Sequence, residues 1–318
     1  MNILLFGAAG FIGTNLTLKL SKDPNNKITL VDVNRDYFHP NVRAENVSIV
    51  ESPVNENADF QSLFRGQDVI YHLVSTTVPT TSNQQVADEL TANVVMTARL
   101  LDACVSCSVQ KVIFISSGGT VYGKESLCPL KEETQTDPIT SYGVQKLTIE
   151  KLLYLYNYMY GLDYRVIRLA NPYGPYQRPN GILGAVTTFT YKALNREPIV
   201  VYGDGSVVRD FIYIDDAVRG ILNIADGDSE HKTFNLGSGY GTSIRQVLDR
   251  IQSTLQISLD IVWQEGRKVD VPVNFLDITR YETLYGPLNA ISMQEGVRKT
   301  AEFMINAGMC PKKEERSV

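Results

Sequence analysis

The segment Gly7-Ala8-Ala9-Gly10-Phe11-Ile12-Gly13 follows a short apolar strand predicted at residues 2–6 and opens a helix predicted at 11–20. Glycines in this position let the chain turn tightly and bring backbone N–H groups against a pyrophosphate. The anion then lies at the helix N-terminus, where the helix dipole favours negative charge. The segment therefore predicts a strand–turn–helix unit that binds a dinucleotide.

Asp32 stands near the end of the next predicted strand, at 27–33, nineteen residues after Gly13. A carboxylate there accepts both ribose hydroxyls and repels a 2′-phosphate, which favours NAD over NADP. Arg35, three residues further on, could instead meet that phosphate, or it could be an ordinary solvated loop cation. The sequence predicts NAD as the cofactor and leaves the role of Arg35 open.

The rest of the first half repeats the alternation of strand and helix. Further strands are predicted at 68–74, 111–116 and 164–169, with helical patterns at 84–104 and 140–160 between them. Fully apolar strands between helices are typical of a parallel sheet that is covered on both faces. We therefore expect an α/β protein with a doubly wound parallel-sheet Rossmann fold.

After residue 171 the chain changes to turns rich in proline and glycine, interleaved with short strands and helices. The helices expected in this part lie at 215–225, 243–255 and 294–305. The pattern indicates a smaller C-terminal α/β cap that binds substrate. We assign residues 1–170, with a returning segment at about 208–238, to the NAD-binding domain, and residues 171–207 and 239–318 to the substrate-binding cap.

Composition limits the partners. The 318 residues carry a net charge of −5 and have no basic run, so nucleic acid is not an expected partner. The N-terminus has neither a basic flank nor a long apolar run, and we expect a cytoplasmic protein without a membrane segment. The four cysteines include a C-x-x-C pair, Cys104 and Cys107, but no second pair that would complete a zinc site. We predict no metal.

The segment Tyr142-Gly143-Val144-Gln145-Lys146 gives a second signal. On a helix, residues four positions apart share a face, so the phenol and the ammonium can reach the same ligand. Moving the pKa of a free tyrosine from about 10 to about 7 requires roughly 4 kcal/mol of extra stabilisation of the phenolate. The charges of Lys146 and of a nicotinamide ring are natural sources of that stabilisation.

With these motifs the chain resembles the extended short-chain dehydrogenases/reductases of the nucleotide-sugar epimerase/dehydratase family, and its pattern is most similar to that of the UDP-glucose 4-epimerases. The resemblance covers nearly the whole chain. It rests on Gly7–Gly13, Asp32, Asn93, SSGGTVYG at 116–123, SYGVQK at 141–146, NPYGP at 171–175, RDFIYIDD at 209–216, FNLGSG at 234–239 and RKVDVP at 267–272.

The resemblance implies a role for each matching residue. Tyr142 is the expected catalytic base, and Lys146 is expected to hold the ribose and lower the pKa of the tyrosine. The expected cofactor-binding residues are Gly7, Gly10, Phe11, Ile12, Gly13, Asp32, Asn34, Leu73, Val74, Asn93, Ser116, Tyr142 and Lys146. The expected substrate-binding residues are Asn171, Arg209, Arg267 and Asp270.

One position departs from the family pattern. The family usually has an active-site Ser or Thr three residues before the Val-Tyr-Gly of its motif, and here that residue is Gly118. Ser117 or Thr120 could supply the missing hydroxyl, and an intermediary water is a third possibility. We expect Thr120 to be the more important of the two side chains.

The same loop bears on the reaction. Family dehydratases and decarboxylases carry an acidic residue beside the active-site hydroxyl, and Gly118-Gly119-Thr120 has none. We predict NAD-dependent 4-epimerisation of a nucleoside-diphosphate sugar, most simply a UDP-sugar, through a transient 4-keto intermediate. The alternatives are a nucleotide-sugar 4-ketoreductase, or an NAD-binding sensor that has lost catalysis.

Alternate tyrosines at Tyr154, Tyr156, Tyr158 and Tyr160 end the helix predicted at 140–160. With leucines nearby, they indicate either internal packing or a helix–helix dimer face. We expect a homodimer.

Overall fold

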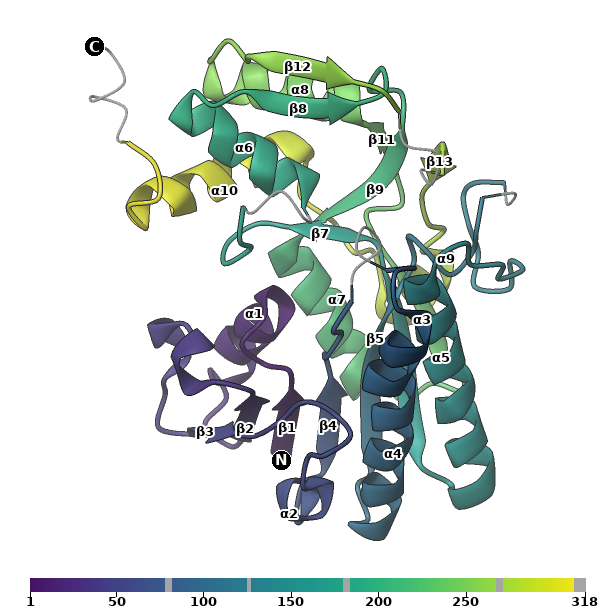
Figure 1. Ribbon diagram of the computed structural model, residues 1–318. Helices are drawn as coiled ribbons and strands as arrows, with labels where there is room; N and C mark the ends of the chain where they lie inside the picture. The colour runs from purple at the N-terminus through teal and green to yellow at the C-terminus, as the bar shows by residue number, and fades with distance from the viewer. Residues whose placement is uncertain (78–81, 125–126, 180–183, 267–270, 312–318) are drawn as a thin grey trace. The chain divides into compact units, whose positions relative to one another are not determined.

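The computed structural model describes residues 1–77, 82–124, 127–179, 184–266 and 271–311 (Figure 1). The chain forms two compact units. Unit 1 holds Met1–Gly123, Gln135–Leu169 and Ile221–Phe234, and unit 2 holds Lys124–Thr134, Ala170–Gly220 and Asn235–Val318. Residues 124–134 and 208–220 thus belong to unit 2, whereas the sequence pattern assigned them to the NAD-binding domain. That each unit binds one ligand remains a prediction.

Unit 1 follows the predicted alternation. Its elements are β1 (Asn2–Phe6), α1 (Phe11–Leu20), β2 (Lys27–Asp32), η1 (Arg35–Tyr37), η2 (Pro40–Val42), β3 (Val47–Glu51), α2 (Phe60–Phe64), β4 (Val69–His72), α3 (Val86–Leu90), the π-helical turn η3 (Thr91–Val95), α4 (Met96–Ser106), β5 (Lys111–Ser117), α5 (Ser141–Tyr160) and β6 (Asp163–Leu169). Two more elements, α7 (Ile214–Asp226) and β10 (Thr233–Leu236), begin in one unit and end in the other.

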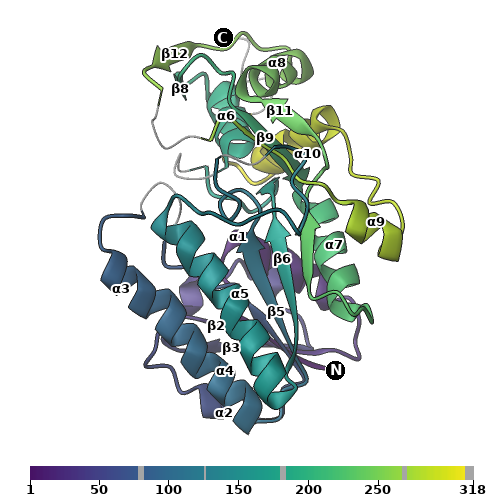
Figure 2. The same ribbon diagram turned by 90° about the vertical axis from the view of Figure 1, so that its right-hand side faces the viewer.

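The seven-stranded sheet has the order β10-β6-β5-β4-β1-β2-β3. Strand β1 pairs in parallel with both β2 and β4, so the strand order reverses between β1 and β4. Right-handed crossovers place α1 on one face of such a sheet and α4 and α5 on the other. Figure 2 shows α4 and α5 side by side in front of β5 and β6. Ligands of doubly wound sheets bind outside the carboxyl ends of the strands at this reversal.

Apolar side chains from the strands and helices form the core of unit 1. Phe6 and Phe114 of the sheet and Leu100 of α4 are fully buried in one cluster, together with Ile149 and Leu153 of α5. Buried apolar residues on both sides of the sheet explain why its strands read as continuous apolar runs.

One helix differs from the prediction. The pattern at 84–104 predicts a single helix, but the structure divides it into α3, the π-turn η3 and α4. Asn93 lies in the π-turn, and its amide donates to the Glu89 carbonyl at 3.0 Å as well as to groups outside the helix. Single π-helical turns inside α-helices are frequent at functional sites.

Two elements of unit 1, β3 and α2, were not predicted from the sequence pattern.

Unit 2 contains short strands and helices. Its elements are β7 (Asn171–Tyr173), α6 (Ala185–Asn195), β8 (Ile199–Tyr202), β9 (Val208–Tyr213), β11 (Gly241–Ser243), α8 (Ile244–Leu255), β12 (Ile261–Gln264), β13 (Val273–Asn274), α9 (Thr279–Tyr285) and α10 (Met293–Asn306). Strand β9 pairs with β7, β11 and β13, and β8 pairs with β12. Helices α6, α8 and α10 pack against one another through an apolar cluster that includes Leu194, Leu255 and Met304.

Candidate functional site

The glycine loop of unit 1 has three glycines with three different geometries. Gly7 adopts φ +84°, and a Cβ there would lie 2.7 Å from the Val74 side chain. A Cβ on Gly13 would lie 2.4 Å from the Ala8 carbonyl oxygen. Gly10 is different, since the nearest atom to a Cβ there is 3.9 Å away. The first and third glycines therefore permit close packing, and the middle one leaves the backbone open to a ligand.

The start of α1 can receive an anion. Its first helical bond runs from the Thr14 N–H to the Gly10 carbonyl at 2.9 Å, so the N–H groups of Phe11, Ile12 and Gly13 have no acceptor within the helix. Gly10 is the N-cap residue, and no described side chain caps the helix. The loop therefore fits a pyrophosphate, as the sequence predicts.

The Asp32 carboxylate lies at the end of β2 and faces this loop. Its Oδ2 accepts the Ala9 N–H at 2.8 Å, and its Oδ1 accepts the Val33 N–H at 2.8 Å. An ionised carboxylate has about four acceptor positions, so both oxygens can accept further hydrogen bonds from ribose hydroxyls. The loop backbone thus fixes the orientation of the group expected to bind the ribose.

Two neighbours of Asp32 are engaged elsewhere. Asn34 accepts the Asp36 N–H at 2.8 Å and caps the short helix η1. The Arg35 guanidinium donates to the Ile49 carbonyl of β3 at 3.1 Å. These contacts give Arg35 a structural partner, which agrees with the preference for NAD.

The loop after β4 is tied to the start of α5. Leu73 donates its N–H to the Phe6 carbonyl at 2.9 Å. Asn93 accepts the Thr76 N–H at 3.0 Å and donates to the Gln145 side chain at 2.8 Å. The buried Asn93 therefore joins the π-turn to this loop and to the helix that carries Tyr142 and Lys146.

Sequence reasoning missed a buried carboxylate in the same network. Glu89 of α3 accepts the Ser141 hydroxyl at 2.5 Å and the Gln145 amide at 3.0 Å. The hydrogen bond from Ser141 is the main cause that lowers the pKa of Glu89. The sequence signal is weak, because Glu89 lies in an ordinary helical pattern far from Ser141 along the chain.

Tyr142 lies on the first turn of α5, which the Thr140 side chain caps by accepting the Gly143 N–H at 3.1 Å. Burial raises the pKa of Tyr142 to about 12, and a hydrogen bond with the Ser117 side chain opposes that rise. Ser117, at the end of β5, is thus a neighbour of the expected base.

Thr120 has a different environment. Its hydroxyl oxygen is buried and has no hydrogen-bond partner among the residues that the structure describes. Its carbonyl lies 2.8 Å from the position that a Cβ on Gly143 would take, so the loop packs tightly against α5. The expectation that Thr120 replaces the family hydroxyl stays a prediction, and Ser117 is the alternative.

Lys146 is buried beside β5. Its Nζ donates to the Ile115 carbonyl at 2.9 Å and lies 4.7 Å from the centre of the Phe114 ring and 5.6 Å from that of the Tyr142 ring. Burial lowers the pKa of Lys146 to about 8, and the charge of Glu150 opposes that fall. The Tyr–Lys pair is thus brought together as the spacing predicts.

Ser116, expected to contact the cofactor, donates its hydroxyl to Glu150 at 2.5 Å. Glu150 in turn pairs with Arg168 of β6. Sequence reasoning missed both charged residues, although Glu150 follows Lys146 by four positions on the same helix.

The expected substrate residues belong to unit 2. Asn171 donates its amide to the Asp210 carbonyl at 2.8 Å. Arg209 donates to the carbonyls of Val208 at 2.8 Å and Val271 at 2.5 Å. Arg267 and Asp270 lie outside the described residues, but Val271 directly follows them in the chain. Arg209 therefore binds the backbone of the described residue that follows the other two expected residues in the sequence.

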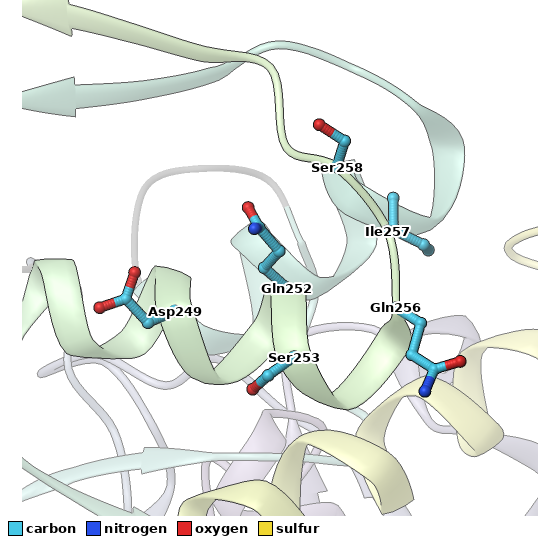
Figure 3. Close-up of a pocket in the computed structure, with 6 residues that line it drawn as sticks. All are labelled: Asp249, Gln252, Ser253, Gln256, Ile257 and Ser258. Carbon is cyan, nitrogen blue, oxygen red and sulfur yellow. The ribbon is translucent and has the colours of Figure 1, made fainter.

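Unit 2 also has a polar hollow of about 410 Å³ (Figure 3). Helix α8 contributes Asp249, Gln252 and Ser253, and the segment after it contributes Gln256, Ile257 and Ser258. None of the predicted site residues lines it. We do not assign the hollow to the reaction.

The predictions of no metal and no membrane segment can be compared with the described residues only. Within them, no group of three or more His, Cys, Asp or Glu side chains could hold a metal ion. No described helix combines the length and apolar character that a membrane span requires. Cys104 is buried, Cys107 is half-buried, and both are free thiols.

The glycine loop, the Asp32 carboxylate that faces it and the Tyr–Lys pair are typical of the nucleotide-binding part of an oxidoreductase-type enzyme. The model of the NAD dependent epimerase/dehydratase family matches residues 3–237, and the chain belongs to this family.

Known relatives extend this assignment over the whole chain. The UDP-glucose 4-epimerase of Mycolicibacterium smegmatis is 31% identical over 311 residues, which cover 96% of this chain and 99% of that protein. The UDP-glucose 4-epimerase of Thermotoga maritima, solved with UDP-glucose, is 31% identical with a TM-score of 0.88 over 96% of this chain and 99% of that one. The UDP-glucuronic acid 4-epimerase of Bacillus cereus, solved with UDP-glucuronic acid and NAD, is 26% identical with a TM-score of 0.85 over 96% of this chain and 100% of that one.

These similarities confirm three predictions: the α/β fold class, the resemblance to nucleotide-sugar epimerases of the extended short-chain dehydrogenase/reductase type, and NAD as the cofactor. The chain is an NAD-dependent enzyme of that type.

Proposed function

We propose that the protein is a 4-epimerase of a UDP-sugar. The observation that carries this proposal is the Tyr142–Lys146 pair on α5: a phenol whose ring centre lies 5.6 Å from a buried ammonium. A proton can leave and return at the phenolic oxygen, which is what removal and replacement of the C4 hydroxyl proton of a sugar requires.

The cofactor is expected to lie along the carboxyl ends of the strands of unit 1. The start of α1 would hold its pyrophosphate, Asp32 the adenosine ribose, and Lys146 the nicotinamide ribose. When bound, NAD supplies the oxidation and re-reduction at C4 of the sugar. The remaining cofactor contacts are assigned to Leu73, Val74 and Asn93 on the resemblance to the family, supported by their positions around the glycine loop and the loop after β4.

Tyr142 is proposed to accept the C4 hydroxyl proton and to return it when the opposite configuration forms. Because burial raises the pKa of this phenol to about 12, the reaction needs positive charge beside it. Lys146 is the proposed protein source of that charge. Ser117 is proposed to hydrogen-bond the reacting oxygen together with Tyr142, in place of the hydroxyl that the family carries at the position of Gly118.

The substrate is proposed to be a UDP-sugar because the relatives named above act on UDP-glucose and UDP-glucuronic acid. Asn171, Arg209, Arg267 and Asp270 are the residues proposed to bind its nucleoside diphosphate. An arginine suits a pyrophosphate, since its planar group donates two parallel hydrogen bonds to phosphate oxygens.

We also propose that the enzyme is a cytoplasmic homodimer. Tyr156 packs inside unit 1, where its hydroxyl donates to Asp102 of α4 at 2.6 Å. Tyr154, Tyr158 and Tyr160 are exposed instead, and Tyr158 shows 80% of its surface. Internal packing thus accounts for Tyr156, and the exposed tyrosines support the proposed helix–helix contact with a second copy.

The test is turnover by the purified protein. Bound nucleotides are released and identified by mass spectrometry, and the protein is incubated with UDP-glucose, UDP-glucuronic acid and dTDP-glucose. We expect NAD to co-purify with the protein. We also expect NMR to show that one UDP-sugar is converted to its C4 epimer, with no net change in the amount of NADH. Consumption of NADH with a 4-keto sugar nucleotide would indicate the ketoreductase instead, and bound NAD without any turnover would indicate the sensor.

A further inference from the structure

Lys146 shares the buried side of α5 with a second charged residue, Glu150. The two lie four positions apart, so they occupy consecutive turns of one helix face. Consecutive residues of β5 bind them: the Ile115 carbonyl accepts the Lys146 Nζ at 2.9 Å, and the Ser116 hydroxyl donates to Glu150 at 2.5 Å. The charges of both side chains are thus fixed against the same strand end.

A third charge comes from β6. Arg168 is the register partner of Ser116, and its Nη2 donates to Glu150 at 2.7 Å. Its Nη1 donates to the Tyr122 hydroxyl at 3.0 Å, and its guanidinium lies 4.9 Å from the centre of the Tyr122 ring. The side chains of Arg168 and Glu150 are only 7% and 6% exposed. The pair is therefore held rigidly and away from water.

Stability alone does not explain this pair. Removing two charges from water costs several kcal/mol per ion, and apolar residues of similar size often serve as well or better. Lys146 bears the cost of burial too, since burial lowers its pKa to about 8 while Glu150 opposes the fall. Among the residues that the structure describes, the other groups that face its ammonium carry no negative charge: the half-buried Tyr142 phenol, the buried His72 of β4 and the Phe114 ring.

We propose that Glu150 is a positioning residue for the reaction, whose buried carboxylate keeps Lys146 charged, and that Arg168 sets how strongly it does so. Glu150 supplies a negative charge one helical turn from Lys146 on the same buried face of α5, and Arg168 offsets part of it. The proposal rests on the role proposed above for Lys146. It adds two residues that act on Tyr142 only through that lysine.

The two partners should act on Lys146 in opposite directions. Glu150→Gln removes the negative charge but keeps the side-chain shape, and the remaining Arg168 then disfavours a second cation. Arg168→Met removes the offsetting positive charge, so that the negative charge of Glu150 acts on Lys146 without a competing cation. A purely structural pair would instead harm the protein in the same way from either side.

The experiment measures the pKa of Lys146 in the purified full-length protein. The lysines are labelled with ¹³C at Cε, and their NMR signals are followed as the pH is changed. Lys146→Arg is used only to assign the Lys146 signal. We expect Glu150→Gln to lower the pKa of Lys146 by roughly one to three units and Arg168→Met to raise it. Shifts in the same direction, or no shift in either variant, would overturn the proposal.

A double variant protects this test against misfolding. A single variant leaves a buried charge unpaired, which can unfold the protein. Glu150→Gln combined with Arg168→Met removes both charges of the pair, so neither of its members is left unpaired. In this variant we expect the pKa of Lys146 to fall by less than in Glu150→Gln alone. An unchanged value in the folded double variant would also overturn the proposal.

A matched control comes from the other end of the same strands. Asp163 pairs with Arg165 at 2.8 Å and is in register with Lys111, at the end of β5 and β6 opposite to Ser116 and Arg168. Asp163→Asn should leave the Lys146 titration unchanged, and an equal shift there would overturn the proposal. If Lys146 shifts as expected but the pH profile of turnover does not follow, the role proposed for Lys146 in the reaction fails, and with it that of Glu150.

Discussion

The two halves of α5 reverse the usual arrangement of a surface helix. In residues 141–150, the polar side chains of Ser141, Gln145, Lys146 and Glu150 are buried. In residues 151–160, the apolar or aromatic side chains of Tyr154, Leu155, Tyr158, Met159 and Tyr160 are exposed. A surface helix normally buries an apolar stripe and exposes its polar residues. Each half therefore needs a reason outside the folding of unit 1.

The reasons differ. Every buried polar side chain of the first half has a hydrogen-bond partner on a neighbouring element, from Glu89 of α3 to Ile115 and Ser116 of β5. Such networks are retained where a site must be rigid and charged. The exposed rings of the second half gain nothing from solvent, and burial against another surface would stabilise them. The first half thus fits the chemistry proposed for it, and the second half fits the proposed contact with a second copy.

Tyr142→Phe tests the first half most severely. We expect turnover to fall by about 10²-fold to 10⁴-fold, because only the oxygen that transfers the proton is lost. The measurement is the rate of C4 epimer formation on whichever UDP-sugar proves to be the substrate.

The matched control is Tyr158→Phe in the second half, which removes the same atom from an exposed ring and should keep full activity. NAD content should remain normal in both variants. Wild-type turnover in Tyr142→Phe would remove the base from the proposed mechanism and leave the buried polar residues without a function.

Ser117→Ala tests whether a hydroxyl of β5, outside α5, takes part in the reaction. The hydroxyl of Ser117 is the one that we propose to act together with the Tyr142 phenol, so we expect a loss of turnover on the order of 10²-fold. Thr120→Ala removes a buried hydroxyl that has no partner among the described residues, and it should change turnover far less. The reverse order of effects would restore Thr120 as the substitute for the missing family hydroxyl.

Tyr158→Asp tests the second half. We expect the dimer to dissociate about 30-fold more readily or more, the effect of losing a central aromatic contact of about 2 kcal/mol. Analytical ultracentrifugation over a dilution series measures this. Tyr240→Asp is the control, because Tyr240 is also highly exposed but belongs to unit 2. A monomeric wild-type protein would show that the exposed rings serve some other contact.

The glycine loop and the Tyr–Lys pair could be predicted from the sequence because each depends on local rules. Gly7 is required by its positive φ, and Gly13 by close packing against Ala8, five residues before it. Tyr142 and Lys146 are fixed by the helical spacing of four. No long-range contact has to be known for either inference.

The other parts of the site depend on contacts between distant segments. The choice between Ser117 and Thr120 depends on how the loop after β5 meets α5, and both carry a hydroxyl. Arg168 finds Glu150 only through the register of β5 and β6. The π-turn of Asn93 interrupts a pattern that reads as one helix, because its amide bonds to segments that precede and follow that pattern. Hydrophobic periodicity does not contain this information.

The smallest expected effect concerns His72, a neutral neighbour of the buried charges on α5. The Thr97 hydroxyl donates to the Asn93 carbonyl at 2.6 Å, so it must accept the Nε2–H of His72 at 2.8 Å. Burial and then the charge of Lys146 lower the pKa of His72 from 6.5 to about 3. The folded protein therefore keeps this histidine neutral at pH values where the unfolded chain binds a proton.

The sign of the pH dependence follows from this difference. As the pH falls below about 6.5, the unfolded state gains a proton that the folded state does not, so the free energy of unfolding decreases by about 1.4 kcal/mol per pH unit until the pH approaches 3. Urea unfolding of wild type and His72→Gln at pH 7, 6 and 5 measures the difference in slope between the two proteins. In His72→Gln, the slope of the free energy of unfolding against pH should decrease by the contribution of about one proton. His231→Gln changes an exposed histidine and should keep the wild-type slope. Equal slopes for wild type and His72→Gln would mean that the folded site accepts the proton. In that case His72 would not stay neutral in the folded protein beside the charged Lys146 and the Phe114 ring that both contact.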